Sequence, residues 1–590
     1  MARRMTKNSG RHGHGSLHPL ARRLIALLAC LLLPFPLAAG AQTPAQTINE
    51  GLRRQNERAQ ELQQRLQPGS DVLHPPPAAS VSTTLPAEQP CFNIRAVELK
   101  SADAMRFGWL ADTALPFLHQ CAGVAGLRQI ATALDAKLIS LGYITSRVTL
   151  PQQNLADGLL TIRLHVGRVA QIAMFDAAGE QRPDSSWGTW RNAFPVSADN
   201  VLDAGDIEQG VEQMKRLPSQ AVTTELSPGT QPDTSDIRIL RQPTGLAGRI
   251  RGGLSIDNSG SRSLGALQAA SHAVLDNLLG LNDIISLSAS TNVQRPAVDH
   301  RSQSLSLDYS IPWGYNTFRF NTSQSRFAQV VQGTTVQFLS SGASSSAEFK
   351  WHRTMLRTSA AKAGVYAAVA TRRASSYLDD VELVVQRRRT TSLETGLTYK
   401  QLLGDASVEI ELGYRQGMPW RVAQEDSPTA ASGGVTLRPR ITLLNGTFRQ
   451  PFTLAGQKAH YEASLHAQRT HDATLSVDQI AIGNRYSVRG FDGDSVLLAE
   501  SGYTLRNEFS MPQALIAGVD SVAYLGIDIG RVWGAGAAIL TGQKLAGAAL
   551  GMRAQWRHLQ LDVALGTPLY KPDGFRTRRW NPYLYLTYAF

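Results

Sequence analysis

The chain has 590 residues, a formal net charge of +12, 50 glycines and 3 cysteines. This length exceeds what one hydrophobic core supports and predicts two or more domains. Six basic residues precede residue 42, and without them the net charge is +6, which gives no reason to expect a nucleic-acid partner.

Residues 1–41 have the features of a secretory signal peptide. Basic residues precede an apolar run from Leu24 to Leu37, and the small residues Ala39-Gly40-Ala41 follow it. The run is too short to span a bilayer, so we expect cleavage before Gln42. A lipoprotein site at Cys30 is rejected, because this cysteine lies inside the apolar run.

The next two segments are polar. Residues 42–66 predict a helix with few apolar positions, which suits a solvated or channel-lining place better than a core. Residues 67–90 contain Pro75-Pro76-Pro77 and a Ser/Thr/Ala tract, and predict a flexible linker, with a disordered tail as the alternative. No run of 18 apolar residues follows the signal peptide, which excludes transmembrane helices.

Two cysteines remain after cleavage, Cys91 and Cys121. In an exported protein this pair predicts a disulfide. Closing a loop of about 30 residues contributes roughly 3–4 kcal/mol in the chain-entropy model. Metal binding needs more ligands than the pair offers, so we expect no metal site.

The pattern becomes globular between residues 91 and 169. A strand near Ile94 is followed by apolar residues at helical spacing from Leu127 to Ile139, and then by two further strands. The order of strand, helices, strand and strand is that of a POTRA module. Residues 142–160 are very similar to the first POTRA domain of two-partner secretion transporters.

A second module covers residues 170–243. Its segment 206–219 resembles the second POTRA helix of the same transporters. The resemblance implies that the two POTRA domains lie in the periplasm and bind the exported protein. The residues of the first module that we expect to contact this substrate are Tyr143, Thr145, Arg147 and Leu150.

Residues 244–590 predict a transmembrane β-barrel. Apolar residues alternate with charged ones, as in Val408, Ile410, Leu412 and Tyr414 against Glu409, Glu411 and Arg415. A soluble sandwich would show the same alternation. The last strand ends on the aromatic Phe590, as outer-membrane barrels commonly do, and other aromatic residues near strand ends suit interface girdles. Roughly 340 residues, at about 10 per membrane strand plus connections, predict 16 antiparallel strands.

Counting strands back from the C-terminus places residues 471–500 in the sixth external loop. This loop contains the tetrapeptide Val488-Arg489-Gly490-Phe491. The strand over 521–533 carries a lone carboxylate, Asp528, on its lumen-facing side between two glycines. A VRG(F/Y) loop followed by such a strand resembles the Omp85 superfamily of outer-membrane transporters and insertases.

The resemblance implies a contact between the loop and the barrel wall. Arg489 on an infolded loop would meet Asp528 through a bidentate, charge-assisted pair. Arg506 and Glu508 share the lumen-facing parity and are competing partners. The alternative is an arginine on a surface loop and a solvated carboxylate.

Enzyme-like patterns are weak in this chain. Gly493-Asp494-Ser495 is similar to an esterase motif, but no partner histidine or oxyanion loop accompanies it. His460 and His466 share a strand face with Glu462, yet their spacing along the strand is too wide for one metal ion. No phosphate loop or dinucleotide pattern occurs, so we expect neither an enzyme nor a cofactor.

Taken from Cys91 to Phe590, the chain resembles the ShlB/FhaC/HecB family of haemolysin secretion/activation proteins. The expected fold is a 16-stranded barrel with two periplasmic α+β POTRA domains and residues 42–66 as a plug helix. We expect an outer-membrane protein of a Gram-negative bacterium that secretes, without ATP, a cognate exoprotein such as an adhesin, a haemolysin or a contact-inhibition toxin.

The other expected partners are outer-membrane lipid and the barrel assembly machinery, through Phe590. An Omp85-type insertase and a passive porin remain the alternatives. Two POTRA modules favour transport over an insertase, and a simple diffusion pore needs neither POTRA modules nor this loop.

Overall fold

The structure, a computed structural model, describes residues 82–590 with gaps at 185–186, 295–298, 333–335, 421 and 515. The predicted signal peptide, the predicted plug helix and the linker up to residue 81 lie outside these residues. In the described part of the chain, no helix is long and apolar enough to cross a membrane.

Residues 82–90, the described part of the predicted linker, contact the helix α4 (Val124–Ser140) through Glu88. The carboxylate of Glu88 accepts hydrogen bonds from the backbone N–H groups of Ala125 (2.8 Å) and Gly126 (2.6 Å). It thereby caps a helix whose own N-cap residue is a glycine without a side-chain acceptor. The last part of the predicted linker is thus in contact with the first POTRA module, and composition does not reveal this contact because the partner helix comes later in the chain.

The first POTRA module is a three-stranded sheet with strand order β2-β5-β4, packed against a long helix. Its helix buries Ile130, Leu134 and Leu138 at spacings of four residues, which place them on one face. Cys91 and Cys121 form a disulfide beside the small β1–β3 pair. The elements are β1 (Phe92–Asn93), β2 (Ala96–Lys100), α3 (Trp109–Ala114), η1 (Leu115–Phe117), β3 (Cys121–Ala122), α4 (Val124–Ser140), β4 (Arg147–Thr149) and β5 (Leu159–His165).

The second POTRA module has a four-stranded sheet with strand order β7-β6-β9-β8 and one helix. Asp203 begins that helix by accepting a hydrogen bond from the N–H of Gly205. The core between helix and sheet contains Val169, Phe194 and Met214. The elements are β6 (Arg168–Phe175), β7 (Gln181–Arg182), α5 (Ala204–Lys215), β8 (Gln220–Pro228) and β9 (Thr234–Pro243).

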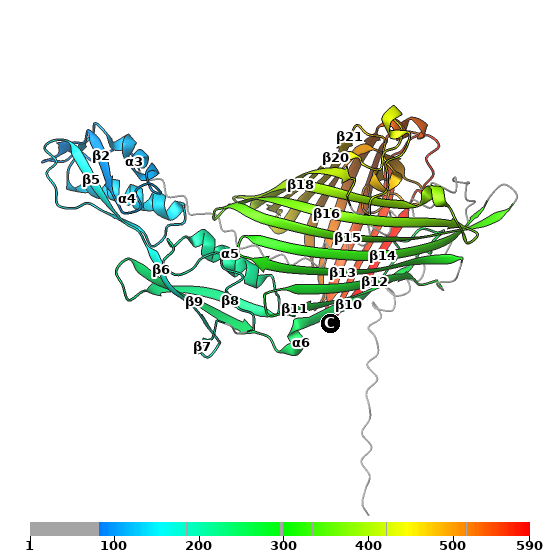
Figure 1. Cartoon of the computed structure of the whole chain (residues 1–590), viewed down its shortest axis with the longest axis horizontal. Coiled ribbons are helices and arrows are strands. Elements are labelled where there is room, and N and C mark those ends of the chain that lie inside the picture. Colours follow the sequence, from blue (N-terminus) through cyan, green and yellow to red (C-terminus); the bar gives the residue numbers. More distant parts are fainter. Residues whose placement is uncertain (1–81, 185–186, 295–298, 333–335, 421, 515) are drawn as a thin grey trace, which may run out of the picture. The chain divides into compact units, whose positions relative to one another are not determined.

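A short helix, α6 (Leu246–Arg249), leads into a closed antiparallel barrel of sixteen spanning strands, which confirms the predicted fold class (Figure 1). A two-residue strand, β17 (Val381–Glu382), extends β16 at one hairpin. The spanning strands are β10 (Ile250–Asp257), β11 (Gln268–Asp276), β12 (Ile284–Asn292), β13 (His300–Trp313), β14 (Asn316–Gln332), β15 (Gln337–Arg357), β16 (Ala361–Leu378), β18 (Arg388–Leu403), β19 (Ala406–Met418), β20 (Arg440–Leu454), β21 (Gln457–Thr470), β24 (Ser501–Gln513), β25 (Asp520–Trp533), β26 (Lys544–Trp556), β27 (Leu559–Tyr570) and β28 (Asn581–Ala589).

The remaining 3-10 turns lie in the loops between these strands. They are η2 (Val384–Gln386), η3 (Ala430–Ser432), η4 (Ser476–Asp478) and η5 (Ala535–Ile539).

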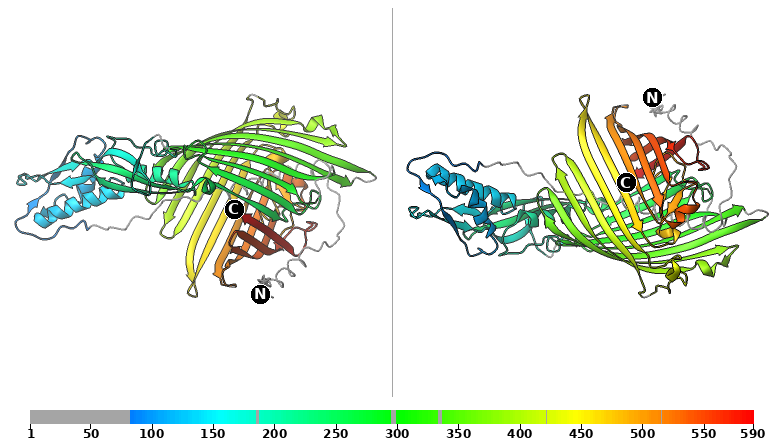
Figure 2. Two further views of the ribbon diagram at one scale, coloured as in Figure 1. Left: turned by 90° about the horizontal axis from the view of Figure 1, so that it is seen from below. Right: turned by 90° about the horizontal axis from the view of Figure 1, so that it is seen from above.

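The barrel closes between its first and last strands, whose register runs from Gly253 opposite Ala589 to Asp257 opposite Tyr585 (Figure 2). Along the strands, large apolar side chains point outward and polar ones point into the lumen. Ile410 and Leu412 are exposed on the outer surface, as the alternation predicts.

The lumen has two chemically different walls. On β12 to β15, serine hydroxyls pair across neighbouring strands, and we call this the hydroxyl wall; its pairs are Ser288–Ser306, Ser290–Ser304, Ser323–Ser346 and Ser325–Ser344. On β24 to β27, three carboxylates and a guanidinium group line the lumen instead, and we call this the charged wall; its members are Glu508, Asp528, Arg553 and Asp562.

Candidate functional site

The loop between β21 and β24, residues 471–500, folds into the barrel. It is the sixth external loop, as strand counting predicts, because β24 returns toward the end of the barrel where the POTRA modules attach. The loop contains η4 and a small hairpin of β22 (Ile480–Ile482) and β23 (Leu497–Ala499). The VRGF tetrapeptide lies in the turn that joins the two hairpin strands.

An apolar cluster holds this loop against the barrel. Val488 and Phe491 are fully buried, and Phe491 packs edge-on against Phe575 with ring centroids 5.6 Å apart. The hairpin and neighbouring strands supply the rest of the cluster, which consists of Ile480, Ile482, Leu497, Ala499, Val532, Ala537 and Leu545. Burial of these side chains provides a non-directional attraction that draws the loop inward.

Arg489 fixes the position of the loop on the barrel wall through hydrogen bonds to Asp528. Its Nε donates to Asp528 Oδ2 at 2.7 Å, and a terminal nitrogen donates to Asp528 Oδ1 at 2.8 Å. The backbone N–H of Arg489 donates to the same carboxylate at 2.9 Å. Arg489 is 5% exposed and Asp528 is fully buried. The structure therefore brings the two predicted residues together as a bidentate ion pair.

Glycines on the wall make room for the loop. A Cβ atom at Gly526 would lie 2.3 Å from Cζ of Arg489, and one at Gly530 would lie 2.9 Å from a methyl group of Val488. A Cβ atom at Gly547 would lie 1.9 Å from the carbonyl oxygen of Arg489. The two glycines beside Asp528 thus act as the sequence pattern indicates, and a third comes from the next strand.

Glu508 belongs to the same network and does not replace Asp528. It accepts from Arg489 at 2.6 Å and from Arg553 at 2.6 and 3.0 Å. Arg553 also donates a hydrogen bond to Asp562 at 3.4 Å. Arg506, the other competitor from the sequence, approaches Asp528 only at 3.9 Å. One loop arginine is therefore shared by two carboxylates of the charged wall.

The last barrel strand also binds the tetrapeptide. The hydroxyl of Tyr583 donates to the carbonyl oxygen of Phe491 at 2.9 Å and accepts from the N–H of Gly490 at 2.8 Å. Asn581 donates to the carbonyl oxygen of Gly490 at 2.6 Å. Sequence reasoning missed Asn581 and Tyr583, although both have lumen-facing parity on β28; backbone contacts of this kind leave no motif in the sequence.

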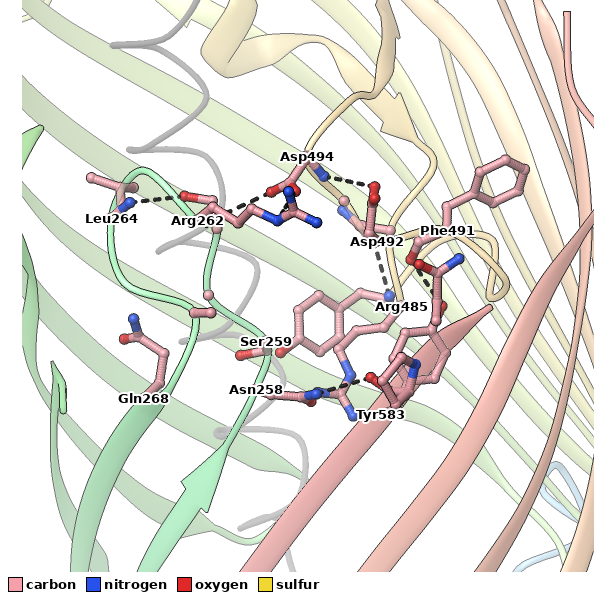
Figure 3. Close-up of a pocket in the computed structure, with 18 of the residues that line it drawn as sticks. Asn258, Ser259, Arg262, Leu264, Gln268, Arg485, Phe491, Asp492, Asp494 and Tyr583 are labelled. Atoms are coloured by element: carbon pink, nitrogen blue, oxygen red, sulfur yellow. Dashed lines mark hydrogen bonds and ion pairs between the residues drawn. The ribbon is translucent and has the colours of Figure 1, made fainter. Parts of the chain in front are cut away.

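A cavity of about 150 Å³ borders the tetrapeptide near the junction of the first and last strands (Figure 3). Arg485 of the loop donates to Asn258 at 3.2 Å and lies over the ring of Tyr583. Arg262 of the first external loop pairs with Asp494 at 3.2 Å. The loop thus contacts both edges of the junction that closes the barrel.

The four POTRA residues do not form one patch. Tyr143 packs edge-on against Phe107 with ring centroids 4.9 Å apart, and Leu150 is half-buried against the module's core. Thr145 lies against Gly167, where the module ends. Of these four residues only Arg147 is fully exposed, and it lies on β4, an edge strand.

In the described part of the chain, no group of three or more His, Cys, Asp and Glu side chains is placed to hold a metal ion. His466 contacts Asn445 at 2.7 Å, and Glu462 pairs with Arg449 at 2.9 Å.

Comparison with known proteins agrees with this geometry. Residues 233–554 match the haemolysin secretion/activation protein family ShlB/FhaC/HecB, residues 92–167 match the ShlB-type POTRA domain, and residues 168–228 match a further POTRA domain.

Named relatives span nearly the whole chain. The outer membrane transporter CdiB-2 of Burkholderia pseudomallei (strain 1026b) is 33% identical over 560 residues, covering 91% of this chain and 94% of the relative. The hemolysin transporter protein HpmB of Proteus mirabilis is 25% identical, with coverages of 93% and 95%. The solved structure of CdiB from Escherichia coli superposes with a TM-score of 0.79 at 25% identity, covering 94% of this chain and all of that one.

Proposed function

Because this chain belongs to the haemolysin secretion/activation family ShlB/FhaC/HecB, we propose that it carries a cognate exoprotein through its barrel and out of the cell without ATP. The chain is an outer-membrane transporter of two-partner secretion, and its POTRA domains lie in the periplasm. Its family is a class of transporters and not of enzymes.

The observation that carries the proposal is the sixth external loop inside the lumen, held by the pair of Arg489 and Asp528. A loop inside a barrel narrows the route through it. The buried pair makes the docked position specific, because Arg489 gives the Asp528 carboxylate two side-chain donors and one backbone donor. Export then requires the loop to shift, and the pair sets the free energy of that shift.

Substrate capture is assigned to the POTRA domains. The edge position of β4 supports strand addition by an extended, unfolded segment of the exoprotein. Arg147 and Thr149 are exposed on this strand and would flank the added segment. In this proposal Tyr143 and Leu150 shape the module that presents the strand.

The exoprotein is proposed to be an adhesin, a haemolysin or a contact-inhibition toxin. Relatives named as a hemolysin transporter and as CdiB transporters support this class of partner. Folding of the exoprotein outside the cell would make its movement vectorial. Residues 42–66 are proposed to plug the resting pore, and Phe590 is proposed to be recognised by the barrel assembly machinery.

Secretion of the cognate exoprotein tests the proposal directly. We expect the intact chain to release the exoprotein into the medium, and Asp528→Asn to reduce release at unchanged levels of the transporter in the outer membrane. Normal release by a strain without this chain would disprove the transport function. Loss of other outer-membrane barrels in that strain would instead favour the insertase.

Conductance in planar bilayers tests the plug. We expect the intact protein to give small, flickering currents, and a chain without residues 42–66 to give large, steady ones. Equal conductance in both would remove the plug from the proposal, and a large open pore in each would favour a passive porin.

A further inference from the structure

Acidic and basic residues of the barrel strands are distributed differently between the lumen-facing and the outer surface. Every Asp and Glu on the sixteen spanning strands has lumen-facing parity, as Asp308, Glu394 and Glu508 illustrate. Basic residues, in contrast, occur on both faces. The outer surface of the strands therefore carries positive charge without any carboxylate of its own.

The outward basic residues gather at the end of the barrel that faces away from the POTRA modules. Arg301 and Arg389 are each the second residue of a strand that begins at this end, and Arg469 is the next-to-last residue of a strand that finishes there. We call this set the outer basic belt. It consists of Arg301, Arg326, Arg373, Arg389, Arg440, Arg469, Arg531 and Lys544, and within it Arg440 pairs with Asp472 at 2.7 Å.

Two pairs within the belt place like charges directly opposite each other. Arg373 on β16 is the register partner of Arg389 on β18, and Arg531 on β25 is the partner of Lys544 on β26. All four side chains are exposed. Like charges at opposed positions of an antiparallel pair repel each other. Among the described residues no carboxylate forms an ion pair with these four side chains; Arg531 lies over the ring of Trp533, with its guanidinium carbon 6.0 Å from the ring centroid.

The belt borders the apolar band of the barrel. On the same outward faces, Ile529 lies two residues from Arg531, Val369 four residues from Arg373 and Leu397 eight residues from Arg389, and all three apolar side chains are exposed. Such side chains face lipid in a transmembrane barrel, whereas charges are tolerated where the hydrocarbon gives way to headgroups. The belt therefore lies at headgroup depth.

The opposite end of the outer surface has different chemistry. Trp313 and Trp556 are exposed there, together with Tyr588 near the C-terminus. Aromatic side chains of this kind suit an interface of ordinary lipid headgroups. Arg353 on β15 is an outward basic residue at this end. Exposed aromatic residues also occur near the belt end, as Tyr414 on β19 shows, so the two ends differ in the number of their outward basic residues.

We propose that the outer basic belt binds the phosphate groups of an anionic glycolipid in the outer leaflet, of the bisphosphorylated lipid A type. Opposed side chains on neighbouring strands are about 5 Å apart at Cβ, so one phosphate fits between two cationic groups. Guanidinium groups hold phosphate oxygens through two parallel hydrogen bonds. A phosphate between Arg373 and Arg389, or between Arg531 and Lys544, converts the repulsion into two attractions.

Lipid retention by the purified full chain tests the proposal. The protein in neutral detergent, with a chelator present to remove bridging cations, is mixed with bisphosphorylated lipid A or with lipid A from which both phosphates have been removed. The lipid that co-elutes with the protein is then measured. We expect several-fold more of the phosphorylated lipid to be retained, and we expect this excess to fall as salt is raised.

Variants identify the site. The quadruple variant Arg373→Gln, Arg389→Gln, Arg531→Gln and Lys544→Gln should lose most of the excess, and the matched control Arg353→Gln should keep it. Equal retention of the two lipids, or equal retention by the quadruple variant and the unaltered chain, would overturn the proposal. Inorganic phosphate is the third probe: full competition at millimolar concentration would assign the belt to free phosphate and also overturn it.

Thermal unfolding supplies a second readout. Without lipid, the quadruple variant should have a Tm at least equal to that of the unaltered protein, because neutralisation removes two repulsive pairs. Phosphorylated lipid A should raise the Tm of the unaltered protein more than that of the variant. If the quadruple variant does not fold, the double variant Arg373→Gln with Arg389→Gln tests one pair alone, and we expect it to lose a smaller part of the lipid retention and of the rise in Tm. A rise in Tm as large as that of the unaltered protein would exclude this pair as a phosphate site.

Discussion

The charged wall and the hydroxyl wall face the same lumen, but the first holds a loop in place and the second only lines the passage. The charged wall holds a loop through Arg489, which is 5% exposed and shared by Asp528 and Glu508. On the hydroxyl wall, serine pairs such as Ser288–Ser306 at 2.6 Å satisfy each other across strands. Buried charges demand one partner in one geometry, whereas hydroxyls exchange donor and acceptor roles freely. The difference indicates that a wall built to position a loop differs from a wall that only lines a passage.

The largest expected effect comes from Arg489→Ala. This change leaves Asp528 buried without its main partner, and breaking a buried ion pair in this way costs about 3–5 kcal/mol. We expect the loop to leave the wall, which limited proteolysis within residues 471–500 would detect as faster cleavage. Arg485→Ala serves as the control, because Arg485 is an arginine of the same loop whose contacts, a hydrogen bond to Asn258 and a position over the ring of Tyr583, involve no carboxylate of the charged wall. Equal cleavage rates in the two variants would show that the pair does not position the loop.

Gly526→Ala should have the next largest effect. The added Cβ would lie 2.3 Å from Cζ of Arg489, so the guanidinium or the strand must move. Overpacking of this kind costs about 1–3 kcal/mol. The control is Gly446→Ala on β20, where the nearest atom to the added Cβ lies at 3.8 Å. In denaturant unfolding Gly526→Ala should be less stable than Gly446→Ala, and in limited proteolysis its loop should be cleaved faster. If Gly526→Ala had the stability and the cleavage rate of the unaltered chain, this would contradict the close approach of Arg489 to Gly526.

Arg553→Gln should have a smaller effect, because the Arg553 side chain is 46% exposed. Exposed ion pairs contribute about 1 kcal/mol or less, and Glu508 keeps its contact with Arg489 in this variant. We expect a small stability loss that shrinks at high salt. A loss as large as that of Arg489→Ala would mean that the charged wall acts as one cooperative network and not through its buried pair.

The smallest effect is expected for the double variant Ser288→Ala with Ser306→Ala. Removing both partners of a hydrogen bond leaves no unsatisfied group, so the change in unfolding free energy should be below about 1 kcal/mol. Unfolding in denaturant and loop proteolysis should both remain close to those of the unaltered chain. A faster loop cleavage in this variant would show that the hydroxyl wall also positions the loop, and the contrast between the walls would not hold.

Much of the barrel was predictable because side chains alternate with a period of two along a strand. That period places Asp528, Glu508 and Arg506 on the lumen side before any fold is known. It also identifies the outward side chains Ile410 and Leu412. The count of sixteen strands and the side of the sixth loop follow from the same pattern together with chain length.

The same periodicity does not predict which lumen-facing side chains contact each other. The sequence favoured Asp528 as the partner of Arg489 and left Arg506 and Glu508 as competitors. The register of β24 with β25 places Arg506 opposite Asp528 and Glu508 opposite Gly526. Contacts made by Tyr583 and Asn581 come from a strand about ninety residues away, and neither side chain belongs to a motif. Glu88 caps a helix that begins at Val124 for the same kind of reason.

The sequence by itself determined the strand pattern, the lumen-facing parity of each residue, the glycines beside Asp528 and the cysteine pair of the first module, because these depend on local period and composition. The tertiary structure decided how Arg489 is shared between two carboxylates, how serines pair across strands, and which basic residues oppose each other on the outer surface. Those outcomes depend on strand register, which is set by hydrogen bonding between segments far apart in the chain and by the closure of the barrel as a whole.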